Sequence, residues 1–100
     1  KEQRRVDFKF TASYNDDVEK VKSILIEIAQ NHPLVLKDPP IMSRLLAHGP
    51  NSLEYVLRVW CQAPDYWTIY FDINETVKKE FDAQGIEIPF SQMDVHIKEK

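Results

Sequence analysis

The chain has 100 residues, of which 43% are hydrophobic and 29% charged, and its formal net charge is −3 at pH 7. This length and composition fit one domain with a hydrophobic core, and the mild negative charge argues against nucleic-acid binding, which normally uses a basic face. No apolar run approaches the ~18 residues of a membrane span, and no signal-peptide pattern is present, so we expect no direct membrane contact by this segment. The chain does not begin with methionine, and we expect it to be a piece of a longer or processed protein.

The first half of the chain predicts three strands and one helix. Residues 6–14 alternate apolar and polar side chains, which indicates a strand with one buried face. Asp16 and Glu19 have the spacing of a helix capping box, and the apolar stripe that follows ends before Pro33. Residues 41–48 predict a second strand, and the turn at 49–52 leads into a third strand over 53–61.

The second half predicts a longer helix and a short strand. Asp65 is the expected N-cap, an apolar stripe runs from Tyr66 to Phe81, and Gly85 suits the left-handed position after the helix. A short apolar strand is expected after Gly85, ending at Pro89. The element order predicts an α+β, ferredoxin-like βαββαβ domain over residues 1–90, with both helices on one face of an antiparallel sheet. The expected core contains Phe8, Phe10, Val21, Leu25, Ile28, Leu57, Val59, Ile73, Val77 and Phe81.

The third predicted strand also has a face that no helix is expected to cover. Alternation places Val56, Arg58 and Trp60 together on that face. One interpretation is an exposed aromatic side chain partly covered by a loop, which is common in soluble proteins. The other is a contact with a neighbouring domain or subunit, and the sequence leaves both open.

Residues 91–100 are expected to form an additional C-terminal strand and tail. Their apolar side chains would share one strand face and their polar side chains the other. A single strand leaves its backbone groups unpaired, whereas identical strands from several copies can pair and close into a barrel with the apolar row inside. The alternatives are that this segment adds to its own sheet or stays unpaired in the isolated chain. The candidate oligomerisation residues are Gln92, Met93, Asp94, Val95, His96 and Ile97.

The residues that usually carry out catalysis or bind metals form no recognisable pattern. The chain has no glycine-rich phosphate loop, no Gly-x-Ser-x-Gly elbow and no His-Glu-x-x-His motif. His32, His48 and His96 are far apart, and none has a second ligand at metal spacing. Cys61 is the only cysteine, which favours a reducing compartment, and its position on the expected core face indicates a buried hydrophobe. We therefore expect no enzyme activity, no cofactor and no bound metal.

Four segments of the chain carry a further signal: RRVDF at 4–8, VEKVK at 18–22, YVLRVW at 55–60, and KEFDAQGI at 79–86 continuing into IPFSQMDV at 88–95. Together they resemble the C-terminal cytoplasmic domain of the small-conductance mechanosensitive channel family, and they cover most of the chain in the same order as in the family. The last segment is the most specific: a helix, a glycine, a short strand, a proline and Gln-Met-Asp-Val. Ser91 departs from the family pattern, which tends to have a second proline there; serine restores a backbone donor and freedom in φ.

The resemblance implies a homoheptamer in the bacterial inner membrane whose pore opens under bilayer tension and releases ions and small osmolytes during osmotic downshock. This segment would lie on the cytoplasmic side, below membrane helices and a middle domain located upstream in the same chain. It would form the lower wall of a vestibule, which the C-terminal strands would close as a barrel. The alternative is a regulatory module with a ferredoxin-like sheet that binds a small molecule, although such a module has no use for a trailing alternating strand.

Overall fold

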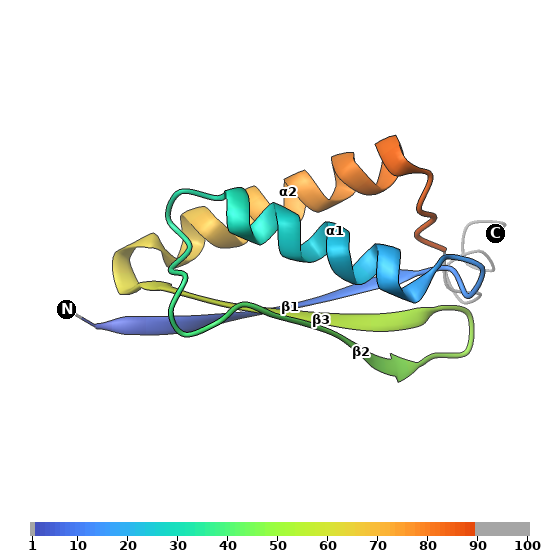
Figure 1. Ribbon diagram of the computed structural model, residues 1–100, viewed down its shortest axis with the longest axis horizontal. Helices are drawn as coiled ribbons and strands as arrows, with labels where there is room; N and C mark the ends of the chain where they lie inside the picture. The colour runs from blue at the N-terminus through green and yellow to red at the C-terminus, as the bar shows by residue number, and fades with distance from the viewer. Residues whose placement is uncertain (1, 90–100) are drawn as a thin grey trace, which may run out of the picture.

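The structure is a computed structural model that describes residues 2–89 of the chain. It has two layers, a three-stranded antiparallel sheet and two helices that cover one of its faces (Figure 1). The class predicted from the sequence, α+β with both helices on the same side, is therefore confirmed. The elements in chain order are β1 (Gln3–Ala12), α1 (Val18–Asn31), β2 (Met42–His48), β3 (Leu53–Gln62), a short 3₁₀ turn η1 (Ala63–Asp65) and α2 (Tyr66–Gln84).

The strand order is β1-β3-β2, so β3 lies in the centre and pairs antiparallel with both neighbours. Pairing of β1 with β3 is continuous along its whole length, whereas β2 has an irregularity between Leu45 and Ala47. Before β2, the backbone N–H of Leu36 donates to the carbonyl of Trp60 at 2.8 Å, which brings a further piece of extended chain against β3. The central strand is thus the one held from both sides.

The core lies between the sheet and the helices, with α1 mainly over β2 and β3 and α2 over β1. Tyr55, Leu57 and Val59 point from β3 into this layer and are 0% exposed. Removing such side chains from water is the main favourable term in folding, at ~25 cal/mol per Å² of apolar area. Nine of the ten predicted core residues are buried, and the tenth, Phe10, is partly buried against the core.

The helix ends follow the predicted chemistry with one shift in position. The N-cap of α1 is Asp17, not Asp16, because Asp17 has the extended backbone and its side chain accepts the N–H of Glu19 at 3.3 Å. Asp65 occupies the N-cap position of α2 but makes no side-chain cap bond, because η1 already gives it a helical backbone. Gly85 ends α2 at φ 75°, as predicted.

The strand predicted after Gly85 is wrong, because residues 86–89 have no strand structure. Glu87 instead contacts the loop after β1: its carbonyl accepts the N–H of Ser13 at 3.0 Å, and its own N–H donates to the Asp16 carboxylate at 3.2 Å. The Asp16 side chain therefore accepts the Glu87 N–H that pairing with a neighbouring strand would use, and Pro89 has no backbone N–H to donate. Within residues 2–89, β1 is therefore an edge strand and the ferredoxin-like fourth strand is not formed.

The first strand also differs from its predicted bounds. It begins at Gln3, so Arg4 and Arg5 belong to the sheet, and it ends at Ala12, because Ser13 starts a turn in which its hydroxyl accepts the N–H of Asn15 at 3.1 Å. The expected C-terminal strand, with Ser91 and the oligomerisation candidates at 92–97, lies outside the described residues.

Candidate interaction surface

The sheet face opposite the helices presents the three residues that the sequence analysis singled out. Val56, Arg58 and Trp60 alternate along β3 with the core residues, as predicted. The strand register adds neighbours that the sequence analysis did not identify, since it did not align the strands with one another. We call this surface the open face, and it consists of Arg5, Asp7 and Lys9 of β1, Met42 and Arg44 of β2, and Glu54, Val56, Arg58, Trp60 and Gln62 of β3.

Val56 lies at the centre of the open face. It pairs with Lys9 on one side and Arg44 on the other, and it is only 6% exposed although it is not part of the hydrophobic core. Long basic side chains commonly lay their aliphatic stems over apolar surface while their charged ends reach water. The open face therefore combines an apolar floor with cationic groups above it.

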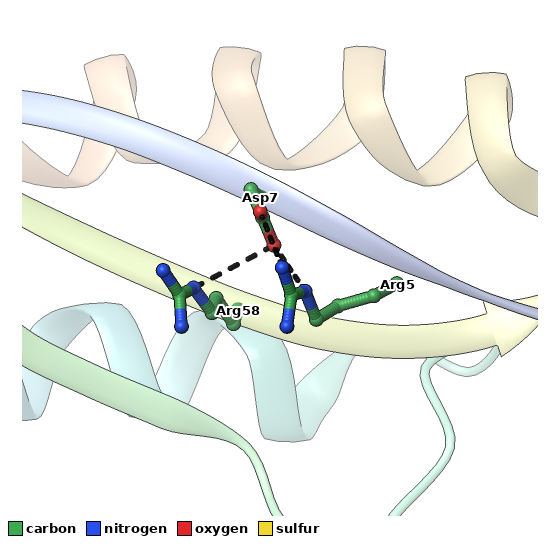
Figure 2. Close-up of polar contacts among 3 residues, drawn as sticks. All are labelled: Arg5, Asp7 and Arg58. Carbon is green, nitrogen blue, oxygen red and sulfur yellow. Dashed lines mark hydrogen bonds and ion pairs between the residues drawn. The ribbon is translucent and has the colours of Figure 1, made fainter.

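A carboxylate between two guanidinium groups organises the open face next to Val56 (Figure 2). Arg5 donates from Nε to Asp7 Oδ1 at 2.9 Å and from a terminal nitrogen to Oδ2 at 3.2 Å, which is a two-point contact. Arg58 approaches from β3, with Nε 3.7 Å from Asp7 Oδ1, too far for a hydrogen bond. That Nε is buried and has no hydrogen-bond partner among the described residues.

The open face carries a surplus of two positive charges, four basic against two acidic side chains, in a chain whose net charge is −3. Glu54 lies 3.9 Å from the Lys9 ammonium, and Asp7 is already engaged by Arg5. Within residues 2–89, no acidic side chain forms an ion pair with Arg44. The charge at this face is thus incompletely balanced by the domain itself.

A groove of about 450 Å³ lies between α1 and α2. At its end, His32 accepts the N–H of Leu34 on Nδ1 at 3.1 Å, so Nε2 carries the proton and donates to Asp72 at 2.9 Å. Both ring nitrogens of His32 are engaged in hydrogen bonds that hold the turn after α1 and link it to α2. Within residues 2–89, no group of three or more His, Cys, Asp or Glu side chains is placed to hold a metal ion.

Cys61 is 0% exposed and lies in the core, as the sequence analysis predicted. Burial raises the pKa of its thiol, Asp65 raises it further, and Arg4 partly offsets the rise. A reactive cysteine needs the opposite environment, one that lowers the thiol pKa and leaves the sulfur accessible. The surroundings of Cys61 fit a structural side chain.

The two packed layers and the cationic open face together define a small α+β domain. The protein-family model described as "Mechanosensitive ion channel MscS, C-terminal" matches residues 5–88 of this chain. The chain belongs to this family of mechanosensitive channels, and it represents the family's C-terminal domain.

Individual relatives agree with this assignment. The chain is 40% identical over 94 residues to a small-conductance mechanosensitive channel of Edwardsiella ictaluri, covering 94% of the chain and 33% of that protein. It is 38% identical over 97 residues to an uncharacterized MscS family protein of Buchnera aphidicola, covering 97% of the chain and 32% of that protein. The crystal structure of Helicobacter pylori MscS in its closed state superposes with a TM-score of 0.84 at 26% identity, covering 90% of this chain and 36% of that one.

The chain spans about a third of the length of these relatives. Those whose names state an activity are channels rather than enzymes. Among the described residues, neither helix combines the length and apolar character that crossing a bilayer requires. The family assignment leaves the alternative of a small-molecule regulatory module without support.

Proposed function

We propose that this chain forms part of the cytoplasmic vestibule of a homoheptameric mechanosensitive channel in a bacterial inner membrane. The complete channel would release ions and small osmolytes during osmotic downshock, and its tension sensor and pore would lie in membrane helices upstream. The observation that carries the proposal is the family match over residues 5–88, together with the superposition on a closed-state channel. The domain would contribute the wall of the chamber and contacts that hold the subunits together.

The open face is the candidate contact with a neighbouring domain or subunit. Val56, Arg58 and Trp60 combine an apolar floor with an incompletely balanced cationic rim, which resembles the mixture of aromatic residues and arginine found at interfaces. The upstream middle domain of the same chain and the adjacent subunit are the partners that this proposal requires.

The second contact is the C-terminal strand, with the domain boundary between residues 90 and 91. Ile86 is 5% exposed and packs in the core. If the chain continued along the β1 edge from there with unbroken alternation, the even-numbered side chains would keep facing the core, and these are polar at 92, 94 and 96. An extension of its own sheet would therefore bury the polar row, which supports pairing of residues 92–97 with copies of themselves.

Deletion of residues 92–100 from the full-length protein tests this role. The truncated channel is expected to give a lower yield of heptamer on cross-linking in membranes, while the domain keeps its fold, because the hydrophobic core is built from residues between Val6 and Ile86. An equal heptamer yield with and without these residues would refute the assembly role of the tail.

Survival of osmotic downshock by cells that lack their own channels tests the wider function, since the full-length protein is expected to protect them.

A further inference from the structure

The outer side of α2 carries an exposed apolar feature that the packing of the domain does not explain. Trp67 and Phe71 are 59% and 58% exposed, and their rings stack at a centroid distance of 5.9 Å. Glu75, four residues after Phe71 and therefore its neighbour on the helix surface, lies at the edge of the groove between α1 and α2. It is exposed and forms no ion pair within the described residues. We call Trp67, Phe71 and Glu75 the aromatic ridge.

Two large stacked aromatic side chains rarely remain in water without a partner, and grouped apolar exposure marks interaction sites. Tyr70 contacts both rings edge-on, at centroid distances of 5.5 Å to Trp67 and 5.7 Å to Phe71, but these contacts still leave Trp67 and Phe71 more than half exposed. The other aromatic rings of α2 pack further into the domain: Tyr70 stacks on Phe8, and the guanidinium carbon of Arg4 lies 4.3 Å from the centroid of the Tyr66 ring. The second of these contacts shows how this protein pairs arginine with an aromatic face. The exposed rings of Trp67 and Phe71 can bind an arginine in the same way.

We propose that the aromatic ridge of one copy docks on the open face of the next copy of this chain, an inference that rests on the proposed homo-oligomeric channel. Guanidinium groups stack favourably on aromatic rings, so Arg44 and Arg58 match Trp67 and Phe71. Glu75 supplies a carboxylate to Arg44, which forms no ion pair within residues 2–89. The apolar floor at Val56 gives the rings a surface to cover.

The charges disfavour the symmetric alternatives. Two open faces placed against each other would bring together two surfaces with a positive surplus, and two ridges would offer aromatic rings no cation. The pairing of ridge with open face is head-to-tail instead. The ridge belongs to the helix layer and the open face to the opposite side of the sheet (Figure 1), so one copy can use both at once. Head-to-tail contacts of this kind close into rings when the rotation between copies allows it.

Paired cysteines in the full-length protein test this geometry. With native cysteines including Cys61 replaced by alanine, Lys9→Cys marks the open face and Thr68→Cys marks the ridge. Neither position belongs to the proposed pairing of Arg44 and Arg58 with the ridge, and the open face keeps a positive surplus without Lys9. Treatment of membranes with a short bismaleimide is expected to link the double variant into a ladder beyond the dimer, while either single variant stays unlinked. A dimer from a single variant would mean a symmetric contact and would overturn the proposal.

Charge exchange tests the specific pairing. Arg44→Glu in the double-cysteine background is expected to abolish the ladder, and adding Glu75→Arg is expected to restore it. Lys20→Glu, the same change of charge on α1 away from both surfaces, serves as the control and should leave the ladder intact. Loss of the ladder without rescue would overturn the pairing of Arg44 with Glu75.

A lysine-reactive cross-linker separates failure of this inference from failure of the proposed function. If it reports the heptamer while the double-cysteine variant gives no ladder, the assembly is right and the assigned surfaces are wrong. If it reports no oligomer either, the proposed homo-oligomeric channel fails together with the interface.

Discussion

Tyr55 provides the sharpest test of the packing, because its ring is 0% exposed while its hydroxyl has no hydrogen-bond partner among the described residues. A hydroxyl that loses its water and finds no partner costs about 1–3 kcal/mol. Tyr55→Phe removes the hydroxyl and keeps the ring. We expect the variant to be more stable than the parent by about 1 kcal/mol, the lower end of that range, because a small void replaces the oxygen.

The same residue predicts a pH dependence with a definite sign. Burial raises the pKa of Tyr55 above its ordinary value of 10.0, and the carboxylates of Asp16 and Asp17 add to the rise. Above that value the unfolded chain releases the proton while the folded chain keeps it, so the free energy of unfolding falls as pH rises through 10. The raised pKa of Cys61 lowers the free energy of unfolding in the same direction, beginning at its lower ordinary value of 9.0.

Urea unfolding of the 100-residue chain, followed by far-ultraviolet circular dichroism at pH 7 and at several values between 8.5 and 10.5, measures both effects. Tyr55→Phe is expected to be more stable at pH 7 and to lose less stability above pH 10, while the decline that begins near pH 9 persists through Cys61. A variant less stable than the parent at pH 7, with an unchanged slope m, would mean that the hydroxyl is satisfied, and the reasoning would be wrong.

Substitutions at three further positions test the helices by the same unfolding measurement. Phe81→Ala should cost about 3–5 kcal/mol because Phe81 is fully buried, and a loss below about 1 kcal/mol would contradict its place in the core. Gly85→Ala should cost about 1–2 kcal/mol through backbone strain at φ 75° alone, since nothing lies within 4 Å of the added Cβ; no loss would contradict the left-handed turn. Asp17→Ala should cost about 1 kcal/mol through the lost N-cap, and Asp17→Asn, which can still cap α1, should cost much less.

Elements whose apolar and polar residues alternate with a clear periodicity could be predicted from the sequence. Features that depend on a single local contact could not. Alternation on β3 was enough to separate the core residues from Val56, Arg58 and Trp60, because a strand has only two faces. The N-cap was displaced by one residue because Asp16 and Asp17 offer the same carboxylate, and only the backbone geometry selects between them. The strand expected after Gly85 does not form, because the Asp16 carboxylate accepts the N–H of Glu87 that strand pairing would use.

The candidate site could be predicted only in part for a related reason. The sequence identified the β3 residues of the open face, but Asp7 and Arg44 join them through the register between strands, which periodicity within one strand does not determine. On α2, the buried residues Ile73, Val77 and Phe81 were predicted as core and Ile69 was not, while no prediction was made for the exposed Trp67 and Phe71. Helical spacing gives the width of an apolar stripe but not how far around the helix the core extends.

The two hydrogen bonds of Glu87 have a mechanical consequence. The chain leaves α2 at Gly85 and is tied at once to Ser13 and Asp16, in the loop that joins β1 to α1. A pull applied beyond Pro89 therefore does not unwind α2 from its end alone. It loads this loop, and through it the edge strand and the first turn of α1, so that tension on the C-terminal end is distributed over both layers of the domain.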